Sequence, residues 1–543
     1  MSEPLTGLGV SPGRTAGPLY RIGPPPALPD VVPPVAEPAA ESEQALAALR
    51  SVSADLDALA ARADGTAAEV LAAEALMAAD ETLAKAVTAK VEVGRPAAWA
   101  ITDAVGEQQR AFEELGGYFA ERAADLADIR DRAVARLLGL PMPGLPSPGE
   151  PYVLVAEDLS PADTALLDPS AVLAVVTVRG GPTSHTAILA KGRGIPAVVG
   201  CPNVLALTDG TVIAVDGTLG EVRAIDVSEA AAVRAEAARE RALLAEITGP
   251  GRTADGHPVP LLLNVGESAD LVEDGEGVGL VRTEFLFLDR TSAPSVEEQR
   301  QAYVEVFRCA GGRPVVIRTL DAGADKPLPF LGLPEEDNPA LGVRGLRVAR
   351  VRPEVLDDQL AAIARAAVDT EADVRVMAPM VATVEEAVWF AGRVRALGLP
   401  AGVMIEVPAA ALRAGRILEV VDFISIGTND LSQYAMAADR MNGDLAALLD
   451  PWQPAVLDLI ALCADAGRAA GKPVGVCGEA GGDPLLAPVL VGLGVTSLSM
   501  SAPSLPAVRA SLAGHTLADC QRLAGLARDA GDAASAKAAS HTR

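Results

Sequence analysis

One of the four histidines in the chain has neighbours that suit a chemical role. His185 lies in the segment GGPTSHTAILAK (residues 180–191), where a glycine-rich turn follows a strand-like run and opens a helix-like run. Backbone N–H groups in such a turn can face an anion, and the helix dipole favours negative charge there. The imidazole could therefore take up and release a phosphoryl group. The alternative is that Thr183 or Ser184 caps the helix and that His185 has no chemical role.

Charged side chains in the second half of the chain follow short apolar runs. Arg282, Arg318 and Arg440 carry planar guanidinium groups that match phosphate and carboxylate oxygens, so together they predict a polyanionic substrate. Glu406 and Asp430 offer hard oxygen ligands, and with no histidine near them Mg²⁺ is the predicted metal. For each arginine taken singly, a salt bridge at the surface remains the alternative.

A cysteine ends another of these runs. Cys477 lies in VCGE (residues 476–479). Taken alone, it would be a small buried hydrophobic residue. Beside a metal and arginines, its thiol could instead donate or accept a proton.

The elements that must position these residues form a regular pattern after Pro260. Short apolar runs are separated mostly by helical patterns such as Glu354–Asp369 and Thr383–Leu397. Eight strand–helix repeats over about 250 residues predict a (β/α)8 barrel of the TIM type, whose active site lies at the carboxyl ends of the strands. The eight runs are 260–265, 278–281, 314–319, 374–380, 401–406, 422–426, 473–477 and 497–500.

The first half of the chain mixes two patterns, so the fold class is α/β multidomain. Short β-branched runs between Pro151 and Ile225 predict a small α/β domain that carries His185. Alanine- and leucine-rich periodic segments from Glu37 to Leu138 predict a helical bundle inserted into it. The predicted domains are 1–22 with 151–226 (phosphohistidine α/β domain), 23–150 (inserted helical bundle), 227–259 (linker helix) and 260–543 (barrel).

Composition limits the class of partner. The net charge of −27 repels phosphate backbones and anionic lipid surfaces, so neither nucleic acid nor a membrane is a predicted partner. Five cysteines without metal or disulfide spacing, and an N-terminus unlike a signal peptide, predict a cytoplasmic protein. The uncharged stretch Pro484–Val508 contains four prolines, so we expect a buried strand with flanking turns and no membrane span.

Six ordered motifs together resemble Enzyme I of the bacterial sugar phosphotransferase system, the phosphoenolpyruvate–protein phosphotransferase family. The segment around His185 is the first of the six and is similar to the family's phosphohistidine motif. In addition to the six, the opening GLGVSPG (residues 7–13) is similar to the family's start. The likeness covers nearly the whole chain. The other similar motifs are GLVRTEFL (279–286), IRTLD (317–321), MIEVP (404–408), GTNDLSQY (427–434) and VCGE (476–479).

This resemblance implies a role for each matching residue. His185 would accept the phosphoryl group on Nε2, and Cys477 would protonate the enolate to give pyruvate. The resemblance also implies that the bundle docks the small carrier protein HPr, and that the chain is a homodimer. The implied phosphoenolpyruvate-binding residues are Arg282, Arg318, Asn429, Asp430 and Arg440, the implied Mg²⁺ ligands are Glu406 and Asp430, and Lys326 and Arg344 would line the pocket.

Two positions differ from the family pattern. Lys191 stands where an arginine is usual, and Ala324 stands where a glycine is usual. The bundle is too rich in alanine for any carrier-contact residue to be assigned. The carrier is therefore less firmly predicted than the reaction with phosphoenolpyruvate.

Three other readings compete with this one. Pyruvate phosphate dikinase and phosphoenolpyruvate synthase share the half-reaction, but they carry a nucleotide-binding domain, and the chain has no Gly-x-x-x-x-Gly-Lys-[Ser/Thr] loop. A binding protein that has lost catalysis should lack one of His185, Cys477, Glu406 or Asp430, and all four are present. A metal-dependent lyase barrel would fit the arginines and carboxylates but gives no reason for the His185 segment.

Overall fold

The computed structural model divides the chain into two compact units, residues 1–239 and 240–543. Each unit is described by itself. The structure describes residues 4–22, 26–61, 66–115, 117–140, 144–146, 148–159, 163–164, 166–181, 185–266, 271–272, 274–287, 290, 292–323, 328–334, 336–440 and 442–540.

The second unit is a closed barrel of eight parallel strands that follow one another in chain order. Every strand lies within the apolar run that predicted it, so the (β/α)8 prediction is confirmed. Most strand residues are buried, as expected when side chains fill the barrel on one face and helices cover the other. The strands are β9 Leu261–Val265, β10 Val278–Val281, β11 Val315–Arg318, β12 Val374–Ala378, β13 Ala401–Ile405, β14 Phe423–Ile426, β15 Val474–Val476 and β16 Ser497–Met500.

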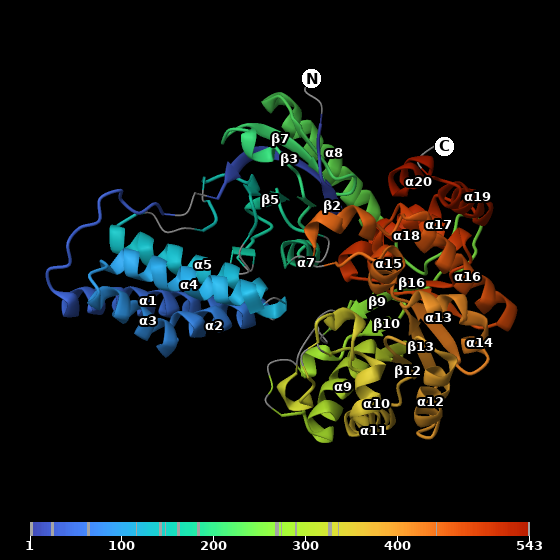
Figure 1. Cartoon of the computed structure of the whole chain (residues 1–543). Coiled ribbons are helices and arrows are strands. Elements are labelled where there is room, and N and C mark those ends of the chain that lie inside the picture. Colours follow the sequence, from blue (N-terminus) through green and yellow to red (C-terminus); the bar gives the residue numbers. More distant parts are fainter. Residues whose placement is uncertain are drawn as a thin grey trace. The chain divides into compact units, whose positions relative to one another are not determined.

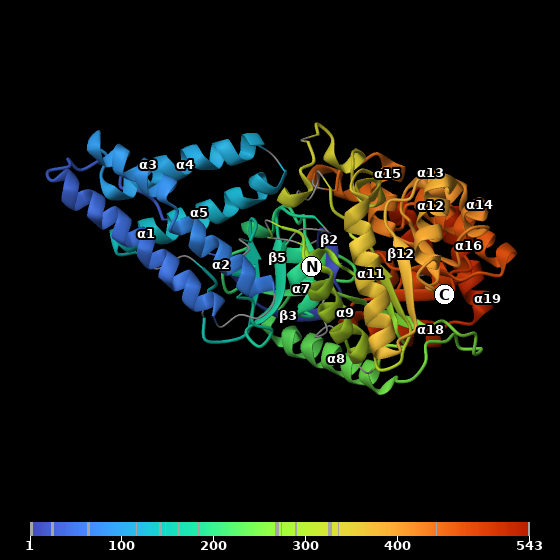
Figure 2. The same ribbon diagram turned by 90° about the horizontal axis from the view of Figure 1, so that it is seen from below.

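Helices cover the outside of the barrel (Figures 1 and 2). Three of them begin with capping boxes, at Ser295, Thr383 and Thr516. In each, the cap hydroxyl accepts a hydrogen bond from the backbone N–H three residues later, and the acidic side chain of that later residue accepts one from the backbone N–H of the cap residue. Their apolar stripes join one hydrophobic core with the strands. The helices of this unit are α9 Val296–Ala310, α10 Leu346–Val351, α11 Pro353–Thr370, α12 Val384–Arg395, α13 Pro408–Leu412, α14 Ala414–Leu418, α15 Thr428–Met436, α16 Pro454–Ala470, α17 Leu486–Gly492, α18 Leu505–Ala513, α19 Leu517–Arg528 and α20 Ala533–Ser540.

The first unit contains an eight-stranded mixed sheet of order β1-β8-β7-β3-β4-β5-β6-β2. Strand β3 pairs in parallel with β4 and antiparallel with β7, so strands from the first 22 residues lie in one sheet with strands from beyond residue 150. Its strands are β1 Leu5–Thr6, β2 Leu8–Ser11, β3 Arg14–Arg21, β4 Tyr152–Ala156, β5 Val172–Thr177, β6 Ala197–Val199, β7 Val212–Asp216 and β8 Glu221–Ala224.

The helical part of the first unit has breaks between α2 and α3 and between α4 and α5 that the sequence pattern did not predict. Asp80 separates α2 from α3, and its Oδ1 accepts hydrogen bonds from the backbone N–H groups of Thr82 (2.7 Å) and Leu83 (3.1 Å). Because Asp80 caps the start of α3, α2 ends before it, although the apolar pattern of the sequence continues through this point. The helices are α1 Pro38–Ala60, α2 Thr66–Ala78, α3 Glu81–Glu92, α4 Ala97–Leu115, α5 Gly117–Leu138, α7 His185–Gly192 and α8 Val227–Glu246.

Two further expectations can be compared with the described residues. The long helix predicted from residue 227 is present as α8. The strand expected within Pro484–Val508 is present as β16, but helices α17 and α18 flank it where turns were expected. Pro488 and Pro506 lie in the first turn of α17 and of α18, where a backbone N–H would have no acceptor within the helix, so neither proline prevents helix formation. The predicted break at Asp64–Gly65 lies outside the described residues.

Within the described part of the chain, one helical stretch, Ala447–Ala470, is long and apolar enough to cross a membrane by length and composition alone. Its helix α16 buries Val456, Leu457 and Ile460 in the barrel core. In the apolar part of this stretch, 39% of the residues are buried inside the structure.

Candidate active site at the barrel mouth

Arg318 ends strand β11 and is held by acidic side chains at the barrel mouth. Its Nη2 lies 2.9 Å from Glu284 Oε1, and its Nη1 lies 3.1 Å from Asp321 Oδ2. Glu284 also accepts a hydrogen bond from the Asp321 backbone N–H at 3.0 Å. All three residues are buried. The carboxylates hold the guanidinium in one orientation at the carboxyl end of a barrel strand.

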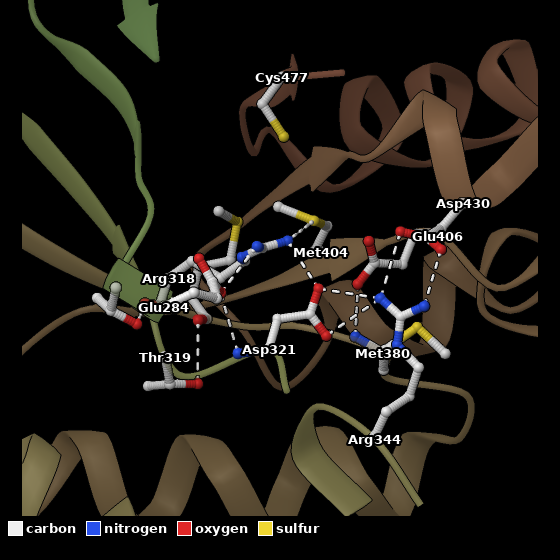
Figure 3. A network of polar contacts seen from close by, with 12 residues as sticks. Glu284, Arg318, Thr319, Asp321, Arg344, Met380, Met404, Glu406, Asp430 and Cys477 are labelled. Carbon is white, nitrogen blue, oxygen red and sulfur yellow. Dashed lines mark hydrogen bonds and ion pairs between the residues drawn. The ribbon is translucent and has the colours of Figure 1, made fainter. Parts of the chain in front are cut away.

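Arg344 joins this cluster from the long connection that follows β11. Its side chain is 1% exposed and lies between two carboxylates, with Nη2 3.1 Å from Asp321 Oδ2 and Nη1 3.1 Å from Asp430 Oδ1. Asp321 therefore links Arg318 to Arg344, as Figure 3 shows. Arg344 was predicted only as a residue of the pocket lining, and the structure makes it the centre of the ion-pair network.

Glu406 and Asp430 place carboxylates near one another on neighbouring elements. Glu406 follows β13 and Asp430 lies in the first turn of α15, directly after β14. Glu406 is 1% exposed, and its Oε1 accepts a hydrogen bond from the Met380 backbone N–H at 2.6 Å. Burial, together with the charges of Asp430 and Asp321, raises the pKa of Glu406 to about 8. A cation at this place would favour the ionised carboxylate.

The donor set at these two carboxylates fits Mg²⁺. Among the described residues no group of three or more histidine, cysteine, aspartate or glutamate side chains could hold a metal by itself. Mg²⁺ is commonly held by one or two carboxylates while substrate oxygens and water complete the shell. The buried negative charge of Glu406 and Asp430 has the chemistry that such an ion requires.

Cys477 lies one residue beyond strand β15 and is 3% exposed. Its backbone N–H donates to the Ile426 carbonyl at 3.0 Å, and its Sγ lies 3.6 Å from the same oxygen. Burial raises the pKa of the Cys477 thiol to about 11, although a hydrogen bond with Ser425 and the charge of Arg318 act in the opposite direction. The thiol therefore keeps its proton at neutral pH, which suits a proton donor.

The next residue explains how Cys477 reaches the mouth. A Cβ on Gly478 would lie 2.0 Å from Thr428 Oγ1 and 2.5 Å from the Thr428 backbone nitrogen. Only glycine permits the turn after Cys477 to approach the start of α15 this closely. The Glu479 backbone N–H then donates to Asn429 Oδ1 at 2.9 Å, which connects the two strand ends.

The remaining predicted residues fall into two groups. Arg440 lies beside Asp430, with Nη1 3.6 Å from Oδ2, and Arg282 is an exposed residue directly after β10. The barrel thus gathers Arg318, Asp430, Glu406 and its other strand-end residues at one end. His185 begins helix α7 in the other unit, but its side chain lies outside the described residues, as does Lys326.

The structure also shows a buried support that the sequence analysis did not identify. Gln359 on α11 accepts a hydrogen bond from the Leu320 backbone N–H at 2.9 Å and donates to the Tyr303 hydroxyl at 3.1 Å. Leu320 directly precedes Asp321, so this contact fixes the loop that carries the network. A polar residue inside the apolar stripe of the predicted helix Glu354–Asp369 was the available signal, and its partner could not be read from the sequence.

Comparisons with known proteins match nearly the whole chain. Three family models match: "PEP-utilising enzyme, PEP-binding domain" over residues 241–517, "PEP-utilising enzyme, mobile domain" over 148–220, and "PEP-utilising enzyme, N-terminal" over 6–122. The first of these covers the barrel that holds the candidate site.

Two curated relatives share a name. A phosphoenolpyruvate-protein phosphotransferase of Streptomyces coelicolor is 53% identical over 99% of this chain and 99% of its own length. Another, of Haloferax volcanii, is 44% identical over 82% of this chain and 81% of its own. A solved structure, the solution structure of Enzyme I (nEIt), is 28% identical and covers 44% of this chain and 99% of that one, at a TM-score of 0.37.

Proposed function

The chain belongs to the phosphoenolpyruvate-protein phosphotransferase family, and from its barrel we propose how it carries out that reaction. The phosphoryl group of phosphoenolpyruvate passes to His185 and then to a histidine of the small carrier protein HPr, which is the first step of the sugar phosphotransferase system. Pyruvate is the other product. The observation that carries the proposal is the network of Arg318, Arg344, Asp430 and Glu406 beside Cys477 at one barrel mouth.

The arginines would bind the substrate. Phosphoenolpyruvate carries a phosphate and a carboxylate, and guanidinium groups donate paired hydrogen bonds to both. Arg282, Arg318 and Arg440 would hold the phosphate and the carboxylate, with Asn429 and the Asp430 backbone assisting. Because the carboxylates hold Arg318 in place before substrate arrives, little reorganisation is needed during transfer.

Glu406 and Asp430 would hold Mg²⁺ together with substrate oxygens. When bound, the ion would supply positive charge that neutralises the transferring phosphoryl group and the enolate. The protein's own part is to keep both carboxylates buried and close together, and the Met380 N–H fixes the Glu406 side chain for this purpose.

Cys477 would complete the reaction. Transfer to Nε2 of His185 breaks the bond between phosphorus and the enol oxygen and leaves enolpyruvate. Carbon 3 then takes the proton of the Cys477 thiol, whose S–H electron pair stays on sulfur, and water later returns a proton to the thiolate. The high pKa of this buried thiol keeps the proton available at neutral pH.

The partners and location follow from the same proposal. Residues 23–150 would form the helical bundle that docks HPr. The other domains would be 1–22 with 151–226 (phosphohistidine domain), 227–259 (linker helix) and 260–543 (barrel). The enzyme would act as a homodimer. All five cysteines are free thiols, which suits the cytoplasm. Light scattering of the purified chain measures the oligomeric state directly.

A pyruvate assay tests the role of the barrel mouth. With HPr and Mg²⁺ in excess, wild type should convert phosphoenolpyruvate to pyruvate at a rate that saturates with substrate. Arg318→Lys keeps the charge but loses the planar fork, so it should raise KM and lower kcat together. Arg375→Lys, at an exposed pair with Asp373 on β12, is the matched control and should change neither. Unchanged kinetics in Arg318→Lys would refute the assignment.

A further inference from the structure

The peptide of Cys477 lies just past the end of a strand ladder. Strands β15 and β16 pair at Gly475↔Ser497 and Val476↔Leu498, and no further pair includes Cys477. Its N–H is fixed by the Ile426 carbonyl of β14. Its carbonyl is held differently, because the Asn264 side chain donates Nδ2–H to it at 3.0 Å.

Asn264 reaches this carbonyl from a strand that is not a neighbour of β15. It lies in β9, and β16 stands between the two strands in the barrel order. The side chain therefore crosses the carboxyl end of β16 to reach Cys477. On the way, Nδ2 also lies 3.4 Å from the Ser499 carbonyl oxygen.

The orientation of the Asn264 amide is determined by its surroundings. Two carbonyl oxygens face one end of the amide, so that end must be the NH₂ group, which only donates. The other end, Oδ1, accepts the Ser499 hydroxyl hydrogen at 2.6 Å. With both ends engaged, the amide cannot turn without losing hydrogen bonds at both.

Strand β10 leaves room for this arrangement. A Cβ on Gly279 would lie 2.4 Å from Ser499 Oγ and 2.6 Å from Ser499 Cβ. Any larger residue at 279 would displace the serine that orients Asn264. The absence of a side chain at position 279 on β10 thus leaves space for the Ser499 side chain of β16, although β9 lies between these two strands in the barrel order.

We propose that Asn264, oriented by Ser499, is a positioning residue for the proton-donating Cys477. It fixes the Cys477 carbonyl, while Ile426 fixes the N–H, and so the peptide that carries the thiol is held at both ends. A planar enolate has two faces, and a thiol held at one place delivers its proton to one of them. This inference rests on the proposed role of Cys477 in forming pyruvate.

The consequence concerns proton transfer and leaves phosphoryl transfer in place. Asn264 contacts the Cys477 backbone and Ser499, whereas Arg344, Asp321 and Asp430 of the ion-pair network lie in other segments of the barrel. Loss of the amide should therefore lower the fidelity of protonation at carbon 3 while His185 is still phosphorylated. A merely structural role would reduce both steps together.

The test uses the full chain with Mg²⁺, HPr and phosphoenolpyruvate that carries deuterium at one position of carbon 3, in tritiated water. The handedness of the resulting methyl group in pyruvate reports the face of protonation. In parallel, single-turnover transfer of ³²P to the protein reports the phosphoryl step. The test variants are Asn264→Leu and Ser499→Ala. Cys477→Ala is the reference for a chain that no longer selects the face of protonation. Ser501→Ala is the matched control, because the Ser501 hydroxyl contacts Ser504 instead of Asn264.

We expect wild type and Ser501→Ala to give one methyl configuration, and Cys477→Ala to give a racemic methyl group. Asn264→Leu should give a largely racemic methyl group and a kcat lower by about 10- to 100-fold, with ³²P transfer within about threefold of wild type. Ser499→Ala removes only the hydroxyl that orients the amide, so it should lose part of the configurational purity even if Asn264→Leu does not fold.

Two results would overturn the inference. One is retained configuration in both Asn264→Leu and Ser499→Ala. The other is a Ser499→Ala variant that loses ³²P transfer and the configurational purity of the methyl group to the same extent, because Asn264 and Ser499 would then have a structural role only. A wild-type chain that takes no ³²P, or that gives a racemic methyl group, would instead refute the proposed function and the inference with it.

Discussion

Glu74 in the helical part of the first unit offers a sharp test of buried electrostatics. It lies on α2, is 0% exposed, and faces Asp125, Asp128 and Arg132 of α5. Burial, the charge of Asp128 and a hydrogen bond with Asp128 raise the pKa of Glu74 to about 10, while Arg132 acts in the opposite direction. In the folded chain this carboxyl is therefore neutral at pH 7.

The raised pKa has a definite consequence for stability. In the unfolded chain Glu74 ionises with its ordinary pKa of 4.5, so the folded state binds more protons between pH 4.5 and about 10. The stabilisation is fully present below pH 4.5 and is lost as the pH rises through this window. Each pH unit between these limits lowers the contribution by about 1.4 kcal/mol at most.

Glu74→Gln removes the titration and keeps the shape of the side chain and a donor toward Asp128. From pH 4.5 to pH 7 the ionisation of the unfolded chain costs the wild type about 3 kcal/mol, so the variant should be more stable by up to about that amount at pH 7. Near pH 4 the two chains should be equally stable. Above pH 7 the gain should grow further.

Hydrogen–deuterium exchange of α5 peptides in the full chain measures the free energy of local unfolding around Glu74. Comparing variant with wild type at the same pH cancels the intrinsic exchange rate. Glu92→Gln, an exposed glutamate at the end of α3, is the matched control and should change protection by less than about 0.5 kcal/mol. The reasoning would be refuted if Glu74→Gln had the same stability as wild type at pH 7, if it were less stable, or if the difference in stability did not change with pH.

Three further predictions concern the barrel. Cys477→Ala should lower steady-state pyruvate formation by about 10²- to 10⁴-fold in a coupled assay while single-turnover labelling of His185 persists, and equal loss of both would contradict its role as proton donor. Gly478→Ala forces a Cβ toward Thr428 and should displace the thiol, lowering kcat by about 10²-fold, and an unchanged kcat would contradict the close approach. Arg344→Met removes one of the two guanidinium groups beside each of Asp321 and Asp430, which leaves excess buried negative charge, and should destabilise the barrel by about 3–5 kcal/mol in urea unfolding, where a loss below about 1 kcal/mol would contradict the network.

The barrel could be predicted from the sequence because its strands are buried on both faces. Such strands are short continuous apolar runs, and all eight were recognisable, some of them with a charged residue at or directly after the strand end. Helix limits were harder to predict where a local hydrogen bond decided them, as at Asp80 between α2 and α3. The short strand β8 has no distinctive apolar run and was not predicted.

The contacts within the site could be predicted only in part. Residue types at strand ends indicated Arg318, Glu406, Asp430 and Cys477. Their partners come from distant elements, and Arg344 reaches Asp430 across 86 residues of chain. Asn264 is a polar residue in an apolar run, and only the closure of the barrel brings it to Cys477, across 213 residues.

The most direct test of the central claim is the fate of the phosphoryl group. The wild-type chain and the His185→Ala variant are each incubated with ³²P-labelled phosphoenolpyruvate and Mg²⁺. In a separate experiment the wild-type chain is incubated with γ-³²P-ATP instead. We predict acid-labile, base-stable label from phosphoenolpyruvate on wild type alone, located on the peptide that contains His185. Label that is absent from wild type, equal on both chains, or obtained from ATP would contradict the account.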